Sequence, residues 1–271
     1  MAKLSPDQIE ILDANLAVDE LTVLADFLAH FDISGKRVLE LGGCIPASMT
    51  KDAAIWWSVD PAHAAAGHTG HQQRIPACAE DLPDEIHDVD LVFACNSFQH
   101  IESLESAYRQ LAGVMRPGAA IFAHYGPIWT APDGMHFENV ELDGGCYSFW
   151  DGAKMPSWSH LVLEPYEFLK LAIELNGESD GRRLAEYVES STWINRLSLA
   201  QHLALPQQSG FRVESAQGAR QFGYAYEPPA IPAWCARRFC KDQLDKSFSR
   251  HAVTAAEALY RDLRLVLVKQ G

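Results

Sequence analysis

The chain has 271 residues and a formal net charge of −14, from 22 Lys and Arg against 36 Asp and Glu. Hydrophobic residues make up 48% and charged residues 21%, which is typical of a globular protein and excludes a disordered or fibrous one. A chain this acidic has no basic surplus for phosphates or anionic lipids, so we expect neither nucleic acid nor a membrane as its partner.

The sequence carries no targeting signal that we recognise. No run approaches the ~18 apolar residues of a membrane span. The segment from Met1 to Pro6 precedes an acidic amphipathic stretch, not the apolar core of a signal peptide. The cysteines are scattered without a CxxC pair. We therefore expect reduced thiols and a cytoplasmic location.

The first half of the chain alternates strand and helix patterns. Apolar residues recur at three- and four-residue spacing, which predicts a helix over 6–31. Short apolar runs predict strands at 37–41, 53–59, 74–78, 90–95 and 119–125. A helix is expected over 103–115, where Arg116-Pro117-Gly118 ends it. Strands that read as continuous apolar runs are buried on both faces, which favours a parallel sheet covered by helices.

The second half begins with a break in this rhythm. Residues 126–160 are rich in Gly, Pro, Trp and His and show no period, and so long an irregular stretch is usually functional. Later patterns predict helices at 165–176, 195–208 and 233–261, and strands at 210–214 and 263–268. The sequence therefore predicts an α/β fold with a mostly parallel seven-stranded sheet, helices on both faces and a lid-like insertion after the fifth strand.

A set of motifs follows these strands in a fixed order. They are Val38-Leu39-Glu40-Leu41-Gly42-Gly43, Ser58-Val59-Asp60-Pro61, Ala79-Glu80-Asp81-Leu82-Pro83, the run from Asp90 to Ile101, and Met115-Arg116-Pro117-Gly118-Ala119. With this order and spacing the chain resembles the class I S-adenosylmethionine-dependent methyltransferases, over residues ~36–125 and more weakly over 161–213. The resemblance implies a Rossmann-like sheet, S-adenosylmethionine as cofactor, and methyl transfer as the reaction.

The resemblance also suggests how one domain over residues 1–271 is organised. We expect an N-terminal helical segment (1–35), a cofactor-binding core (36–126), an acceptor-side insertion (127–195), and C-terminal helices with the last strands (196–271). No internal repeat or convincing linker divides the chain.

The expected cofactor site lies beyond the carboxyl ends of the strands, where open α/β sheets bind ligands. Gly42 and Gly43 let the backbone approach a ligand closely. Asp60 ends the second predicted strand, where a carboxylate can accept hydrogen bonds from ribose hydroxyls. The resemblance implies the other contacts: Glu40 toward the methionine end, Ala79 and Glu80 beside the adenine, and Asn96 after the fourth strand.

The chain also departs from the family pattern. The later glycines of the turn fall at Cys44 and Pro46, and Cys78 stands where an acid is expected. We expect a stiffer turn, with Pro46 opening the following helix. A non-catalytic, cofactor-binding scaffold of the same fold stays open as an alternative.

The acceptor site is expected at strand ends and in the insertion. Methyl transfer is an in-line displacement that needs alignment, and a hydroxyl acceptor also needs a base. The candidate bases are His100, His124 and His136, and the candidate substrate contacts are Tyr125, Trp129, His160 and Arg196. We expect a small-molecule acceptor with an oxygen nucleophile, although nitrogen, sulfur and carbon acceptors stay open. Core packing, helix-start hydrogen bonding or an internal salt bridge would explain the same residues.

Parts of the sequence are also compatible with a nicotinamide site or a metal site. A nicotinamide-dependent oxidoreductase would suit the Tyr166 and Lys170 spacing, but residues 42–46 lack the GxGxxG pattern. Metal ligands are conceivable at His63, His68 and His71, but this loop lacks a helical spacing of its histidines and a nearby Cys. A cluster of His124, His136, Glu138 and His160 would resemble a two-His-one-carboxylate site, and it depends on how the insertion folds. We assign no metal ligand, and the sequence leaves the metal question and the oligomeric state open.

The charge is divided unevenly. Residues 1–126 hold 7 basic and 18 acidic residues (7 − 18 = −11), and residues 127–271 hold 15 and 18 (15 − 18 = −3). The second part is therefore expected to meet any anionic group of the acceptor, through Arg182, Arg183, Arg196, Arg237 and Arg238.

Overall fold

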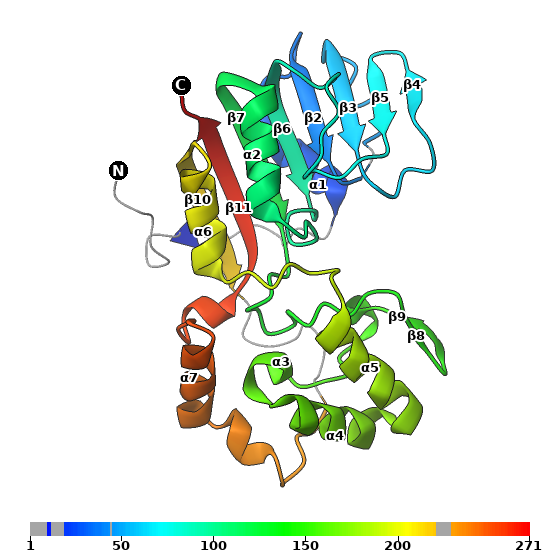
Figure 1. The fold of residues 1–271 in the computed structure, drawn as a ribbon, viewed down its shortest axis with the longest axis vertical. Coiled ribbons are helices and arrows are strands. Elements are labelled where there is room, and N and C mark those ends of the chain that lie inside the picture. The colour runs from blue at the N-terminus through cyan, green and yellow to red at the C-terminus, as the bar shows by residue number, and fades with distance from the viewer. Residues whose placement is uncertain (1–9, 12–18, 44, 221–228) are drawn as a thin grey trace. The chain divides into compact units, whose positions relative to one another are not determined.

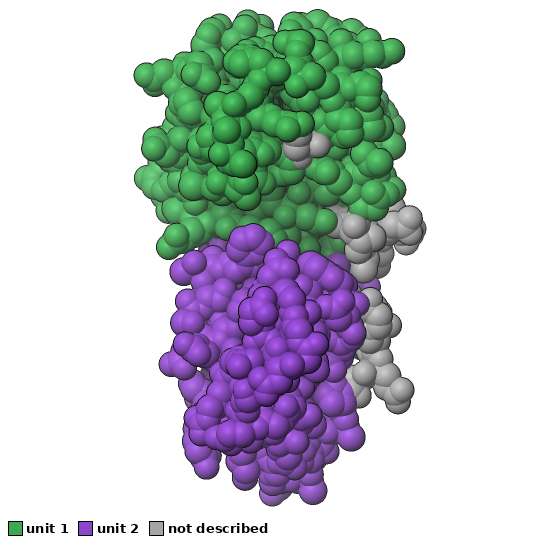
Figure 2. All heavy atoms as spheres, turned by 90° about the vertical axis from the view of Figure 1, so that its right-hand side faces the viewer, with its two compact units in different colours: residues 1–126, 200–219, 262–271 green, residues 127–199, 220–261 purple. Residues whose placement is uncertain are grey.

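The computed structural model describes residues 10–11, 19–43, 45–220 and 229–271. The chain divides into two compact units, which Figure 2 colours separately. The first unit comprises residues 1–126, 200–219 and 262–271, and the second comprises residues 127–199 and 220–261.

The first unit is built on a sheet with the strand order β1-β10-β11-β7-β6-β2-β3-β5-β4 (Figure 1). Its strands are β1 (Glu10–Ile11), β2 (Arg37–Leu41), β3 (Ile55–Val59), β4 (Gly67–Thr69), β5 (Gln72–Ile75), β6 (Val89–Cys95), β7 (Met115–Tyr125), β10 (Phe211–Arg220) and β11 (Tyr260–Lys269). The strands β5, β3, β2, β6 and β7 pair in parallel, and β11 is antiparallel to β7. The predicted α/β fold with a mostly parallel, Rossmann-like sheet is confirmed.

The strand count differs from the prediction. The sequence predicted seven strands, and each predicted strand overlaps an observed one, but the sheet has nine strands within the described ranges. The two additional strands, β1 and β4, lie at the edges of the sheet and are two and three residues long. Strands so short carry no apolar run, so the hydrophobic pattern could not reveal them.

Helices cover both faces of this sheet, as predicted. Figure 1 shows α1 (Glu20–His30) behind the strands, and α2 (Leu104–Val114) and α6 (Leu199–Gln208) in front of them. Phe27 of α1 packs on Phe93 and Phe122, with ring centroids 5.2 and 5.7 Å apart. Arg264 of β11 also binds Asp26 of α1. The strands therefore hold α1 through both apolar and charged contacts.

The predicted helix over 6–31 is only partly confirmed. The helix α1 spans residues 20–30, whereas residues 10–11 form β1 and pair with β10. Residues 1–9 and 12–18 lie outside the described residues, as does Cys44.

The helix expected after Pro46 is absent among residues 45–54. Turn bonds replace it, from Met49 N–H to Pro46 O (2.8 Å) and from Ala53 N–H to Thr50 O (3.0 Å). The Thr50 hydroxyl bonds instead to His71 Nε2 at 2.9 Å. The same hydroxyl also lies 3.4 Å from Ala47 O, and local side-chain to backbone bonds of this kind compete with helical hydrogen bonding.

The second unit has a separate core beneath short helices. Its elements are β8 (Val140–Leu142), β9 (Gly145–Tyr147), η2 (Phe149–Asp151), α3 (Ser159–Val162), α4 (Pro165–Asn176), α5 (Glu178–Ser190), η3 (Ala236–Phe239), α7 (Lys241–Arg250) and η4 (Glu257–Leu259). Met155, Leu171 and Leu184 are fully buried among them. The helix predicted at 165–176 is confirmed as α4. The long helix predicted over 233–261 is wrong, because this span forms the shorter helix α7 and the 3-10 turns η3 and η4. None of the described helices is long and apolar enough to cross a membrane.

Candidate functional site

A glycine turn lies at the switch point of the sheet, between β2 and its two neighbours β3 and β6. Gly42 and Gly43 have φ angles of +73° and +85°, which side chains rarely adopt. A Cβ on Gly42 would lie 2.6 Å from Ser97 Cβ. The turn and the loop after β6 therefore approach each other so closely that only glycine fits. Ligands of open α/β sheets bind at such a point.

Glu40 is fully buried at the end of β2. Its Oε1 accepts a hydrogen bond from Ile45 N–H at 2.9 Å, and its Oε2 accepts one from Trp56 Nε1 at 2.7 Å. Burial raises the pKa of Glu40 to about 7, although the hydrogen bonds from Trp56 and Ile45 oppose this rise. A buried carboxylate at a switch point is a candidate ligand for a cationic or donor group.

Asp60 follows β3 and joins it to the glycine turn. Its Oδ2 accepts a hydrogen bond from Gly43 N–H at 3.0 Å, and its Oδ1 accepts one from Ala62 N–H at 2.7 Å. The Ser58 hydroxyl donates to Gly43 O at 2.8 Å. The structure thus brings together Glu40, Gly42, Gly43 and Asp60, four residues that the sequence assigned to one site.

The other predicted cofactor residues lie in loops that follow β5 and β6. Ala79 is buried, and Glu80 Oε1 accepts a hydrogen bond from Ser103 N–H at 3.1 Å. Ser103 is the N-cap of α2, so Glu80 fixes its own loop to the start of that helix. Asn96 has a φ of +47° and donates its backbone N–H to His124 O at 3.0 Å.

The glycine turn suits a group with a nucleoside and a cationic end. Two adjacent glycines leave the backbone open to close approach. The Asp60 carboxylate has lone pairs for hydroxyl donors beyond the two backbone bonds that it accepts. The buried Glu40 carboxylate suits a cation. On these grounds the residues present fit S-adenosylmethionine.

The two candidate bases of the first unit have different surroundings. His124, near the end of β7, is buried, and desolvation lowers its pKa. Neither ring nitrogen of His124 has a hydrogen-bond partner within the described part of the chain. His100 lies in the loop after β6, where its Nε2 is 3.1 Å from Gln99 Nε2.

Tyr125 is fully buried on β7, where its hydroxyl bonds to Nδ1 of His202 of α6 at 3.0 Å. Desolvation lowers the pKa of His202 to about 3 and raises the pKa of Tyr125 well above its usual value. The imidazole is therefore neutral, and the tyrosine hydroxyl donates. His202 stands in no motif and could not be selected from the sequence.

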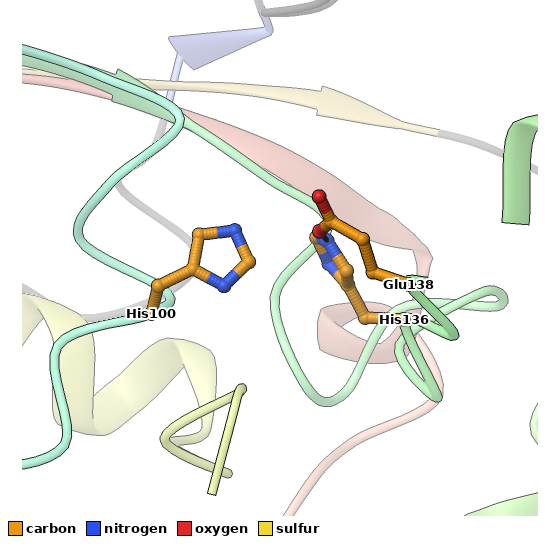
Figure 3. Close-up of side chains that lie close together, drawn as sticks. All are labelled: His100, His136 and Glu138. Carbon is orange, nitrogen blue, oxygen red and sulfur yellow. Dashed lines mark hydrogen bonds and ion pairs between the residues drawn. The ribbon is translucent and has the colours of Figure 1, made fainter. Parts of the chain in front are cut away.

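His136 and Glu138 form a pair in the second unit. Figure 3 shows the His136 imidazole beside the Glu138 carboxylate, and His136 Nε2 lies 3.2 Å from Glu138 Oε2. The same oxygen accepts a hydrogen bond from Trp193 Nε1 at 2.7 Å. Tyr187 Oη donates to His136 O at 3.0 Å, and His136 is buried with a φ of +44°. The imidazole is therefore held in one orientation by its neighbours.

The remaining substrate candidates contact one another within the second unit. His160 Nε2 bonds to Trp129 O at 2.6 Å, and burial lowers the pKa of His160 to about 3. The Arg196 guanidinium lies 5.1 Å from the centre of the Trp129 ring. It also donates to Val188 O and Glu189 O at 2.7 and 3.0 Å. Among the residues that the structure describes, Arg196 thus binds backbone carbonyls and not a carboxylate.

The histidine loop at 63–71 and the Tyr166–Lys170 pair, the other candidate sites, make local contacts. His63 lies 3.2 Å from Ser58 Oγ and His71 lies 2.9 Å from Thr50 Oγ1. Within the described ranges, the histidines of this loop form no group close enough to share one metal ion. Tyr166 is exposed on α4, and the Lys170 ammonium lies over the Trp234 ring at 4.1 Å.

Residues 40–123 match a family described as a methyltransferase domain. No curated protein matches the sequence. A Listeria monocytogenes structure assigned as an S-adenosylmethionine-dependent methyltransferase is 11% identical, with a TM-score of 0.50 over 93% of this chain and 100% of that chain. One from Mesorhizobium loti is 15% identical, with a TM-score of 0.49 over 90% and 96%. At 11% identity the likeness to the Listeria monocytogenes structure shows the fold alone.

The family match falls entirely within the first unit. It contains the glycine turn and the two carboxylates at the ends of β2 and β3. The resemblance found in the sequence is thereby confirmed for this segment: residues 40–123 match the methyltransferase domain.

Proposed function

We propose that S-adenosylmethionine binds at the glycine turn and that its methyl group passes to an oxygen atom of a small-molecule acceptor. The observation that carries the proposal is the junction of Gly43 with Asp60 (3.0 Å) at the switch point of the sheet, inside the matched segment 40–123. Asp60 would accept hydrogen bonds from the ribose hydroxyls, and Glu40 would attract the cationic methionine end. Ala79, Glu80 and Asn96 are the proposed neighbours of the adenine and of the methionine end.

The bound cofactor supplies an activated methyl group on a sulfonium, so the chain mainly has to orient the acceptor and remove a proton. The His136–Glu138 pair supports a general base in the second unit. Glu138 orients the His136 imidazole through its Nε2, which supports His136 as the group that takes the proton of the acceptor. His100 and His124 stay as the alternative bases, and Tyr125, Trp129, His160 and Arg196 as candidate acceptor contacts.

The nature of the acceptor and its location are also proposals. The net charge of −14 supports a small molecule over a nucleic acid. The cysteines of the described residues, Cys78, Cys95, Cys146, Cys235 and Cys240, are free thiols, which supports a reducing compartment such as the cytoplasm.

Thermal unfolding with S-adenosylmethionine, S-adenosylhomocysteine and NAD in parallel tests the cofactor assignment. A ligand at 100 times its dissociation constant should add about 2.7 kcal/mol to the free energy of unfolding. We expect this gain with the two adenosyl ligands and none with NAD. Stabilisation by NAD alone would contradict the proposal.

An acceptor screen tests the reaction. Phenols, other hydroxyl compounds, amines and thiols would be incubated with cofactor carrying a labelled methyl group, and the methylated atom identified by NMR. We expect an O-methyl product. His136→Gln should lower its turnover by roughly 10²–10⁴-fold without changing S-adenosylhomocysteine affinity, because a base acts only on the acceptor. The exposed His87→Gln is the matched control, and equal losses in both variants would exclude His136 as the base.

A further inference from the structure

Glu20, the first residue of α1, places its carboxylate over the glycine turn. A Cβ on Gly43 would overlap Glu20 Oε1 and would lie 3.6 Å from Glu40 Oε1. Gly43 therefore makes room for two carboxylates that come from different elements, α1 and β2. The preceding Asp19 caps the helix by accepting a hydrogen bond from Leu21 N–H at 3.1 Å, which fixes the start of α1.

These two carboxylates interact unfavourably unless a proton or a cation lies between them. The Glu20 and Glu40 carboxylates both lie beside Gly43, and the charge of Glu20 contributes to the raised pKa of Glu40. Desolvation raises the pKa of Glu20, and the charges of Asp19 and Asp60 raise it further. Negative charge is thus concentrated where β2 and β3 end.

A second, independent feature of the same turn indicates a polar ligand. The Ser97 hydroxyl lies beside Gly42, and Ser97 is only 9% exposed. Its Oγ has no hydrogen-bond partner among the residues that the structure describes. A buried hydroxyl without a partner is costly, so a ligand group that bonds to it would stabilise the complex.

We propose that Glu20 binds the α-ammonium group of the methionine moiety of the cofactor, jointly with Glu40. A primary ammonium carries a positive charge and three N–H donors, which match two carboxylates and a nearby hydroxyl. On binding, it supplies the positive charge that offsets the repulsion between the two carboxylates. The assignment rests on the proposed cofactor site, and it adds a cofactor contact from α1, which lies outside the matched segment 40–123.

Isothermal titration with two ligands tests this assignment. S-adenosylhomocysteine has the α-ammonium group, whereas 5′-methylthioadenosine has the nucleoside and a thioether without it. Both would be titrated into the wild-type chain, Glu20→Gln and the control Glu105→Gln. Glu105 is also in the first turn of a helix, α2, and its side chain is exposed, so the control makes the same change in net charge.

We expect Glu20→Gln to weaken S-adenosylhomocysteine binding by roughly 10- to 100-fold, as for the loss of a charged hydrogen bond. Its 5′-methylthioadenosine affinity should match that of the wild type, and Glu105→Gln should leave both affinities unchanged. An unchanged S-adenosylhomocysteine affinity in Glu20→Gln, or equal losses for both ligands, would overturn the assignment. A wild-type chain that bound neither ligand would overturn the proposed function itself.

The ligand-free variant provides a check on folding. Removing one of two neighbouring carboxylates relieves repulsion, so Glu20→Gln should melt no lower than the wild type without ligand. A lower melting temperature together with equally weakened binding of both ligands would show a structural role for Glu20 and would also overturn the assignment.

Discussion

Glu40 accepts its hydrogen bonds from two uncharged donors, Ile45 N–H and Trp56 Nε1, and its burial has a consequence for the stability of the fold. Its pKa rises from about 4.5 to about 7 on folding, because desolvation disfavours the charged carboxylate. Between these values the folded state binds more protons than the unfolded state, so stability falls as the pH rises. The loss is absent below about pH 4.5 and complete above about pH 7.

The variant Glu40→Gln should remove this dependence. From pH 4.5 to 7.5 the wild type should lose about 3 kcal/mol of unfolding free energy relative to Glu40→Gln, from a pKa shift worth about 1.4 kcal/mol per unit. Urea unfolding of both proteins across this pH range measures the difference. Parallel stability curves would show that Glu40 titrates normally.

The glycine turn makes a second prediction at the residue scale. Gly42→Ala should cost about 1 kcal/mol for its positive φ and a further ~1–3 kcal/mol for its clash with Ser97 Cβ. Gly35 has a similar φ of +67° with nothing within 4 Å of its added Cβ, so Gly35→Ala should show only the first cost. The two urea midpoints separate these contributions, and equal losses would argue against the close approach of Ser97.

Residues of the cofactor site could be predicted where an apolar strand, a glycine turn and an acidic residue follow one another in the sequence. This order identified Glu40, Gly42, Gly43 and Asp60, which the structure brings together. Glu20 and Ser97 could not be selected in this way. Glu20 reaches the turn from a helix before the first motif, and Ser97 is one of several polar residues in its loop.

At the scale of elements, long apolar strands were predictable and short edge strands were not. The boundaries of β2 were predicted to the residue. The helix α5 was missed because its sequence, ESDGRRLAEYVES, is polar with only Gly181 and Leu184 buried. The span 233–261 shows the opposite error, since its helical pattern produces only α7 and 3-10 turns.

The hydrogen bond between Tyr125 of β7 and His202 of α6 should stabilise the fold, whether or not Tyr125 also contacts the acceptor. Tyr125→Phe removes the hydroxyl that bonds to His202 Nδ1 and leaves that buried nitrogen without this partner. The free energy of unfolding should fall by about 1–3 kcal/mol. The exposed Tyr166→Phe is the control and should change it by less than about 0.5 kcal/mol. Equal effects of the two variants on chemical denaturation would contradict the buried bond.

At the scale of the whole molecule, the family match and the acceptor candidates divide between the two units. Residues 40–123 lie in the first unit, and His136, Trp129, His160 and Arg196 belong to the second. The arginines expected to meet an anionic acceptor are largely engaged internally: Arg182 pairs with Glu178, Arg183 with Asp143, and Arg238 with Glu167. These three arginines therefore each have an acidic partner within the second unit.

Hydrogen–deuterium exchange with and without S-adenosylhomocysteine tests the central claim most directly, because it reports where a ligand binds. We predict slower exchange in peptides that cover residues 38–46, 58–63, 78–82 and 95–100, no change over α4 and α5, and no effect of NAD in any of these segments. If S-adenosylhomocysteine leaves the peptides around Gly42 and Asp60 unchanged, or if NAD protects them instead, the assignment of this turn as the S-adenosylmethionine site is wrong.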